Sequence, residues 1–390
     1  MKSYRLVLLL TISLFAVFPS LAQSAGGEHE WPSYAADAAF TRYAPLDQIN
    51  AGNIKDVRLA WRWDAPDPEI AKANPNARVG FFKSTPLMVN GVLYVSTPTN
   101  TVAAIDAGTG KTIWNHDPKA YDRGNRVFQH RGVAYWKDGN DERIFIATGG
   151  RQLVAINAKT GEPVSGFGDA GFVDLDEGLD TPLNKKQISY SAPPMVVHDT
   201  IVLGHLLPDE ANNPTVIAGH IRGFDARTGK QKWIFWTIPR PGEFGYETWD
   251  PETWKLAGAA NNWTMMSADT ELGHLYIPTG TPANDFYGGH RKGNGLFAES
   301  IICLDVQTGK RVWHFQGVHH GLWDYDFPAA PILVDINVDG GPIKALAQVS
   351  KQGFTYVLRR ETGEPVWPIE ERPVPQTDVP GEQTSPTQPI

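Results

Sequence analysis

One short pattern recurs five times along this chain of 390 residues, and it constrains the fold more than any other feature. Each copy is a β-rich run, then a polar turn that ends in Thr-Gly, then a second run. The copies occupy residues 102–114 (VAAIDAGTGKTIW), 153–164 (LVAINAKTGEPV), 221–233 (IRGFDARTGKQKW), 301–313 (IICLDVQTGKRVW) and 355–367 (TYVLRRETGEPVW). Four of the five end in a tryptophan, and these are Trp114, Trp233, Trp313 and Trp367.

Each copy predicts a β-hairpin, because alternating apolar residues form strands and glycine takes a positive φ in the tight turn. A unit this small cannot bury its own apolar face, so the tryptophan at a constant offset should fill the space between neighbouring sheets. Further strand candidates precede most copies, at residues 91–97, 143–149, 200–206 and 274–280. Three or four strands per repeat predict an all-β fold, a β-propeller. A sandwich or another stacked β architecture is the alternative.

The repeats lie farther apart than the roughly 40–50 residues of compact blades. The widest gaps, residues 165–220 and 234–300, therefore predict long insertions. Loops on a rigid scaffold usually carry binding and catalysis, so we expect functional residues in these insertions.

Residues 1–25 have the layout of a secretory signal peptide, which predicts export to the periplasm. Lys2 and Arg5 precede an apolar run from Leu6 to Phe18, and small residues follow around Ala22. The run is short for a membrane span, although an uncleaved anchor is the alternative.

The composition excludes some classes of partner. The formal net charge is −8 and no basic run occurs, which argues against nucleic acid and acidic membrane surfaces. Cys303 is the single cysteine, so it cannot form an internal disulfide, and we interpret it as a buried structural thiol.

The densest cluster of chemically active side chains is VHHGLWDYDFPA, residues 318–329. A metal site, a catalytic base beside a flat cofactor and a polar turn would all use such residues. Adjacent residues on a strand point in opposite directions, so His319 and His320 make a poor chelate. The residues alone leave a polar turn and a catalytic base at Asp324 open.

Several longer motifs resemble the PQQ-dependent (quinoprotein) dehydrogenases, where PQQ is pyrroloquinoline quinone. Besides the repeats and residues 318–329, they are residues 30–63, which begin EWPSYAADAAF, residues 128–136 (FQHRGVAYW), 220–229 (HIRGFDARTG) and 385–389 (SPTQP). The resemblance is strongest to the soluble propeller part of the membrane-bound quinoprotein glucose dehydrogenase branch.

This resemblance implies a role for particular residues. Asp324 matches the base that takes the proton of the substrate hydroxyl. Trp263 matches the ring on which the cofactor stacks. Lys351 matches the cation beside the quinone oxygens, and Arg131, next to His130, matches the loop whose arginine pairs with a cofactor carboxylate. In the glucose branch, residues usually separate that histidine from the arginine, whereas here the two are adjacent.

The resemblance also implies a metal, Ca²⁺ or Mg²⁺, which prefers oxygen ligands. Thr281 lies where family members place an asparagine or threonine ligand, and Asp209 lies near the position of the acidic ligand. Glu210 stands beside Asp209, and Asn284 and Asp285 are further oxygen donors near Thr281.

The expected activity is oxidation of a sugar, polyol or alcohol hydroxyl, with a quinone or a cytochrome as electron acceptor and a membrane subunit as a candidate partner. No Cys-x-x-Cys-His haem motif and no Cys-Cys pair occur in the sequence.

The family propeller is eight-bladed, so we expect residues 26–370 to form an incomplete propeller of about five to six blades. Residues 371–390 would then be a Pro/Gln/Thr-rich segment between blades. Two alternatives stay open: a non-catalytic scaffold like the outer-membrane assembly lipoproteins that share the tryptophan repeat, and a truncated, inactive paralogue.

Overall fold

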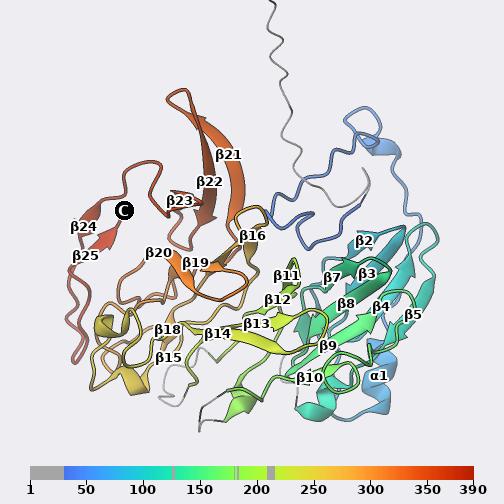
Figure 1. The fold of residues 1–390 in the computed structure, drawn as a ribbon, viewed down its shortest axis with the longest axis horizontal. Coiled ribbons are helices and arrows are strands. Elements are labelled where there is room, and N and C mark those ends of the chain that lie inside the picture. The colour runs from blue at the N-terminus through green and yellow to red at the C-terminus, as the bar shows by residue number, and fades with distance from the viewer. Residues whose placement is uncertain (1–29, 125–127, 180, 182–183, 209–215) are drawn as a thin grey trace, which may run out of the picture.

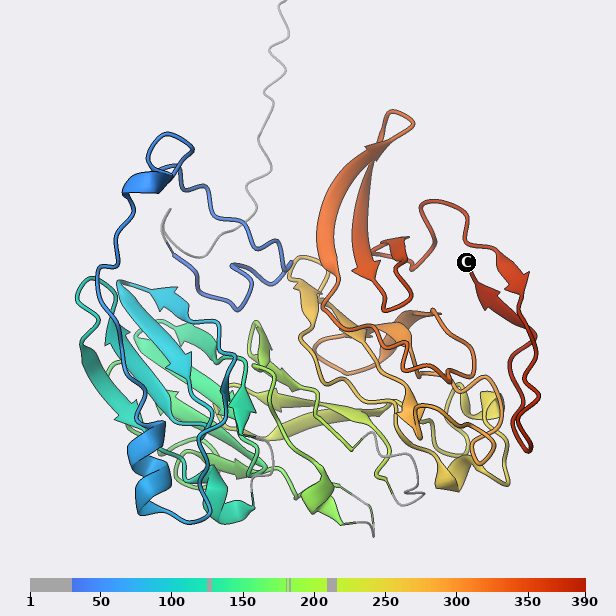
Figure 2. The same ribbon diagram turned by 180° about the vertical axis from the view of Figure 1, so that it is seen from behind.

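The computed structural model describes residues 30–390 except 125–127, 180, 182–183 and 209–215, and this part of the chain is built mainly from short antiparallel sheets. The signal peptide predicted at residues 1–25 therefore lies outside the described residues. Figure 1 shows the sheets following one another along an arc, and Figure 2 shows the same order from behind.

Four of the described sheets have four strands each, joined in sequence order. The first sheet contains β2 (Leu87–Val89), β3 (Val92–Ser96), β4 (Val102–Asp106) and β5 (Thr112–His116). The second contains β7 (Ala134–Asp138), β8 (Asp141–Ala147), β9 (Gln152–Asn157) and β10 (Phe172–Asp174). The third contains β11 (Met195–Val197), β12 (Thr200–Leu203), β13 (His220–Asp225) and β14 (Gln231–Trp236). The fourth contains β16 (Ser267–Asp269), β17 (His274–Pro278), β19 (Ser300–Asp305) and β20 (Arg311–Gln316).

A fifth sheet has three strands, β21 (Ile332–Val338), β22 (Gly341–Val349) and β23 (Thr355–Arg359). Three short pairs complete the strands: β1 (Phe81–Phe82) with β6 (Gln129–His130), β15 (Gly258–Ala259) with β18 (Pro282–Ala283), and β24 (Glu371–Pro373) with β25 (Thr387–Pro389). The helices are short, with α1 at Asp67–Ala73 and 3-10 turns at Ile54–Asp56, Ala120–Arg123, Lys185–Gln187, Tyr246–Thr248 and Trp254–Leu256. The predicted all-β class is confirmed.

Three of the four repeat tryptophans, Trp114, Trp233 and Trp313, join neighbouring sheets as the sequence predicts, whereas Trp367 is exposed. The ring of Trp233, on β14 of the third sheet, lies against Gly309 in the turn of the fourth sheet, and its Nε1 donates to the carbonyl of Val306 at 3.0 Å. Trp313 contacts Gly363 of the fifth sheet in the same way. These glycines have a positive φ and leave no room for a Cβ, so the Thr-Gly sequence is needed for both the turn and the contact.

The second repeat departs from this pattern, because it ends in Val164 without a tryptophan. Phe167, three residues farther along, packs instead against Gly229 of the third sheet. The apolar core thus lies between successive sheets throughout the arc, and Cys303 is buried in it between the fourth and fifth sheets.

The sheets present one common edge to the predicted site. The first strand of a sheet begins at the edge where its antiparallel second strand ends. Trp263 precedes β16 and Thr281 follows β17, while Asp324 precedes β21 and Lys351 follows β22. Arg131 precedes β7 at the same kind of position. In the described part of the chain, no helix has the length and apolar character needed to cross a membrane.

Candidate active site

The structure brings Asp324 and Lys351 into direct contact. Lys351 Nζ lies 2.6 Å from Asp324 Oδ1 and 3.1 Å from Asp326 Oδ2, so one ammonium group bridges two carboxylates. Burial alone would lower the pKa of Lys351, but the hydrogen bonds and charges of both aspartates outweigh it and raise this pKa above its usual value. Lys351 is therefore a permanent cation at neutral pH, placed beside the predicted base.

Asp326 connects the other predicted residues to this pair. Its Oδ2 accepts a hydrogen bond from Trp263 Nε1 at 2.9 Å, and its Oδ1 accepts one from the backbone N–H of Thr281 at 2.6 Å. The Asp326 side chain is nearly buried, and a Cβ at Gly280 would lie within 2.7 Å of Oδ1. Asp326 thus fixes the indole, the Thr281 loop and the lysine relative to one another.

Arg131 approaches Trp263 from the second sheet. Its guanidinium carbon lies 5.6 Å from the centre of the Trp263 ring, within the range of a cation–π contact. Arg131 Nη1 donates to Ser191 Oγ at 2.7 Å, and burial lowers the pKa of Arg131. Within the described residues Arg131 has no carboxylate within ion-pair distance, so it is a partly buried cation available to an anionic ligand.

His130 is buried beside Arg131, and both of its ring nitrogens are engaged inside the protein. Nδ1 lies 2.9 Å from Ser96 Oγ, and Nε2 lies 3.0 Å from the carbonyl oxygen of Ala147. Burial lowers the pKa of His130 to about 4, so the ring is neutral at pH 7. In this arrangement His130 holds the loop that carries Arg131 in place. A contact between His130 and the cofactor stays a prediction.

Of the two residues predicted as metal ligands, Thr281 and Asp209, Thr281 alone belongs to the described residues; the further donors Asn284 and Asp285 are described and buried. Thr281 Oγ1 donates to Glu299 Oε1 at 2.8 Å, and Glu299 Oε2 is buried without a hydrogen-bond partner among the described residues. In that same part of the chain, no three His, Cys, Asp or Glu side chains come close enough together to hold a metal ion. Thr281, Glu299 and Asp326 nevertheless offer only oxygen donors, the type that Ca²⁺ and Mg²⁺ prefer.

Sequence reasoning missed Glu299 and its neighbour Arg291, both of which are buried. Burial raises the pKa of Glu299 to about 8, and the charges of Asp326 and Asp285 add to this effect. Arg291 Nη2 donates to the carbonyl oxygens of Asn284 and Gly321. A signal was present in the sequence, because Glu299 is a charged residue inside the apolar run LFAESIICL.

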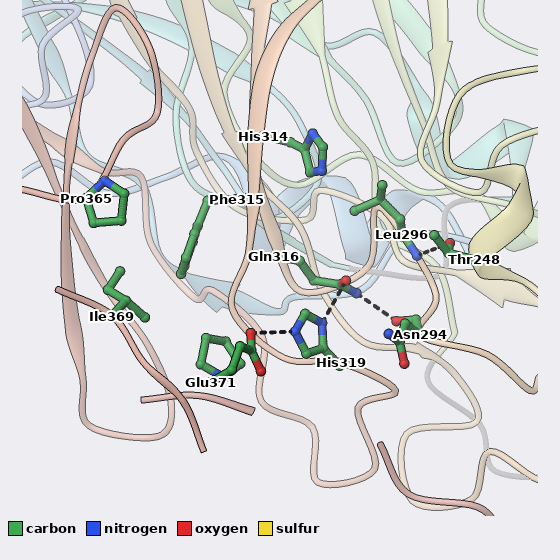
Figure 3. Close-up of a pocket in the computed structure, with 11 residues that line it drawn as sticks. Thr248, Asn294, Leu296, His314, Phe315, Gln316, His319, Pro365, Ile369 and Glu371 are labelled. Carbon is green, nitrogen blue, oxygen red and sulfur yellow. Dashed lines mark hydrogen bonds and ion pairs between the residues drawn. The ribbon is translucent and has the colours of Figure 1, made fainter. Parts of the chain in front are cut away.

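A separate cavity of about 400 Å³ lies at the beginning of the loop that carries Asp324. Its lining includes His314, Gln316, His319 and Glu371, and Figure 3 shows His319 between Gln316 and Glu371. Of the predicted site residues that the structure describes, none lines this cavity.

Comparison with known proteins gives consistent results. The family model described as PQQ: Glucose/ethanol/alcohol dehydrogenase, beta-propeller domain, matches residues 31–390. The chain is 33% identical to quinoprotein glucose dehydrogenase A of Acinetobacter calcoaceticus, over 94% of this chain and 48% of that protein. It is 34% identical to the glycerol dehydrogenase large subunit of Gluconobacter oxydans (strain 621H), over 92% of this chain and 49% of that subunit.

Among solved structures, the quinohemoprotein alcohol dehydrogenase from Comamonas testosteroni matches with a TM-score of 0.73 at 29% identity. This match covers 91% of the present chain and 51% of that one. The chain thus spans about half the length of the curated relatives that it matches.

Proposed function

The chain belongs to the family of PQQ-dependent glucose, ethanol and alcohol dehydrogenases with a β-propeller domain, and from this premise we propose that it oxidises a sugar, polyol or alcohol hydroxyl. The observation that carries the proposal is the joining of Asp324, Lys351 and Trp263 through Asp326, with Arg131 over the Trp263 ring. A purely structural turn would not need a base, two cations and a half-buried indole at one edge of the sheets.

The residues present fit PQQ. The half-buried Trp263 offers an indole face to a flat ring, and Arg131 is a partly buried cation without a described carboxylate partner, suited to a cofactor carboxylate. Lys351, whose ammonium group contacts Asp324, is a second positive charge that could bind the anionic cofactor. When bound, PQQ would supply the oxidant, a quinone that takes up the hydride from the carbinol carbon.

Asp324 would move the proton. One of its carboxylate oxygens, Oδ1, is held by Lys351, which leaves Oδ2 to accept the proton of a substrate hydroxyl. Lys351 stabilises negative charge at this point, and Asp326 keeps the lysine in place through its second contact. The substrate would thus lose its hydroxyl proton to Asp324 as its carbinol hydride leaves.

A divalent cation, Ca²⁺ or Mg²⁺, belongs to the same proposal. Thr281 and, beyond the described residues, Asp209 are its proposed protein ligands, with the buried oxygens of Glu299 and Asp326 next to Thr281. Such a cation would supply Lewis-acid polarisation of a bound carbonyl oxygen.

The proposed location and the proposed electron acceptor rest on the sequence. The N-terminal charges and the apolar run that follows them favour export, so we place the protein in the periplasm. The proposed electron acceptor is a quinone or a cytochrome, and a membrane subunit is the candidate partner that passes the electrons on. The relatives named above are dehydrogenases, which favours an enzyme over a scaffold of the outer-membrane assembly type.

The test is a PQQ titration of the purified chain, with and without Ca²⁺, followed by tryptophan fluorescence. Saturable, metal-dependent quenching together with dye-linked oxidation of glucose, glycerol or ethanol is the expected result. The Asp324→Asn variant should bind PQQ with unchanged affinity and lose most turnover. Absence of PQQ binding would favour the scaffold, and binding without turnover would favour an inactive paralogue.

A further inference from the structure

The loop that carries Asp324 has an unusual backbone. It runs from the end of β20 at Gln316 to the start of β21 at Ile332, and both His320 (φ 49°) and Asp324 (φ 53°) adopt left-handed conformations. Residues with a side chain rarely take this conformation unless the surrounding structure holds them in it. Specific contacts must therefore fix the path of the chain between these two residues.

His320 is the most tightly held residue of this loop. Its side chain is only 2% exposed; Nδ1 lies 2.7 Å from the carbonyl oxygen of Gly293, and Nε2 lies 2.8 Å from Glu382 Oε1. Both ring nitrogens face acceptors, so a ring protonated on both nitrogens satisfies the two contacts. The next residue, Gly321, is held through its carbonyl oxygen by Nη2 of the buried Arg291 at 2.7 Å.

Glu382 is the partner on the other side. Its side chain is 3% exposed, and its second oxygen accepts the backbone N–H of Gly288. Burial alone would raise the pKa of Glu382, but the hydrogen bonds from His320, Gly288 and Gln383 outweigh it and hold the pKa below its usual value. Glu382 is therefore ionised at neutral pH, and its contact with His320 is a buried hydrogen bond at 2.8 Å.

Glu382 lies in residues 371–390, which we name the C-terminal strap. Strands β24 and β25 pair within the strap, and the Tyr356 hydroxyl donates a hydrogen bond to the carbonyl oxygen of Pro389. The side chain of Gln388 binds both the N–H and the carbonyl of His319, at 2.8 and 2.7 Å. The strap thus holds two consecutive residues, His319 and His320, shortly before Asp324.

We propose that Glu382 and His320 are positioning residues for Asp324, and that the C-terminal strap acts on catalysis through them. The proposal rests on the role of Asp324 as base. The chain contains a matched control, since His319 pairs with Glu371 at 3.0 Å at the rim of the cavity in Figure 3, where the Glu371 side chain is 51% exposed.

The first measurement is hydrogen–deuterium exchange of the backbone amides of residues 319–326 in the full chain. Glu382→Ala should speed this exchange by at least about tenfold, because removing one partner of a buried hydrogen bond leaves the buried His320 ring without its acceptor. Glu371→Ala should change it by no more than about fivefold, as expected for an exposed pair. Glu382→Gln, which keeps the hydrogen-bond acceptor, should fall between the two.

The second measurement is turnover of the PQQ- and Ca²⁺-loaded protein. Glu382→Ala should lower kcat by roughly tenfold or more while KM and the PQQ dissociation constant stay within about twofold, because a displaced base affects the chemical step alone. Partial recovery of kcat in Glu382→Gln would support positioning. Circular dichroism of each variant would show whether it is folded.

The outcomes separate the two proposals. Unchanged exchange in Glu382→Ala would overturn the strap's hold on the loop, whatever the activity. Faster exchange with wild-type kcat would overturn the positioning role. A wild-type chain that binds PQQ but does not turn over would contradict the proposed function, and the positioning role would fall with it, even if the exchange data showed that the strap holds the loop.

Discussion

Gly309→Ala tests the contact by which each sheet is joined to the next. Gly309 lies in the turn between β19 and β20 with φ 67°, and a Cβ built there would lie 2.5 Å from Cδ2 and 2.6 Å from Cε3 of Trp233. Alanine in a left-handed conformation costs about 1–2 kcal/mol, and an extra methyl in a closely packed contact about 1–3 kcal/mol more. We therefore expect Gly309→Ala to lower the free energy of unfolding by roughly 2–5 kcal/mol.

Gly91→Ala is the matched control, because Gly91 has φ 76° in the turn between β2 and β3 and no atom within 4 Å of its built Cβ. It should cost only the backbone part, about 1–2 kcal/mol. Urea unfolding followed by far-ultraviolet circular dichroism would give both values. In a Trp233→Ala background, Gly309→Ala should fall to the cost of Gly91→Ala. Equal costs in the wild-type background would refute the view that the indole is packed against the glycine.

Three further predictions concern the site. Trp263→Ala should weaken PQQ binding by at least about tenfold in a fluorescence titration, because the flat ring would lose its stacking face; unchanged affinity would make Trp263 a core residue. Lys351→Met should lower kcat by at least about tenfold in the dye-linked assay, because two carboxylates would then lack their shared cation; wild-type kcat would remove Lys351 from the mechanism. Glu299→Gln should stabilise the chain by about 4 kcal/mol at pH 8 in urea unfolding, with the difference nearly vanishing at pH 4.5. Burial raises the pKa of Glu299 from an ordinary 4.5 to about 8 in the folded chain, so its contribution to wild-type stability is full below pH 4.5 and is lost as the pH rises toward 8. A stability difference between wild type and variant that does not change with pH would contradict a buried neutral acid at Glu299.

The fold was predictable from the sequence because its determinants are local. In three of the repeats the aspartate three residues before the threonine accepts both the N–H and the hydroxyl of that threonine, as Asp305 does from Thr308 at 2.8 and 2.7 Å. These bonds form within one turn, so they are visible in the sequence as a fixed spacing. The substitution of Phe167 for a docking tryptophan was not predictable, since it depends on how a loop returns to the neighbouring sheet.

The site was predictable only in part. The resemblance identified Asp324, Lys351 and Trp263, and the structure places all three around Asp326. The role of Asp326 could not be predicted, because nothing in its local sequence shows that it contacts three other loops. Glu299 was missed for a related reason: the burial of a charge is a property of the packed sheets, and only its position inside an apolar run indicated it.

The contacts of the C-terminal strap could not be predicted from its composition. A Pro/Gln/Thr-rich stretch is typical of a connecting segment, and residues 371–390 contain little that predicts a core. Yet Glu382 lies beside His320, 62 residues earlier in the chain, in a contact nearly closed to solvent. No local pattern links two residues so far apart.

The two adjacent histidines point apart, as expected, although they lie in the loop after β20 and not on a strand. His319 turns toward Gln316 and Glu371 at the cavity rim, whereas His320 turns inward to Gly293 and Glu382. The two rings therefore make a poor chelate for one metal, and here the loop backbone, not the alternation of a strand, separates them. Because a loop with two left-handed residues needs support from outside itself, we interpret this pair as the point where the strap fixes the loop, with the inner histidine making the stronger contact. The same reasoning predicts that His320→Ala will disturb residues 319–326 more than His319→Ala, although the two histidines are neighbours in sequence.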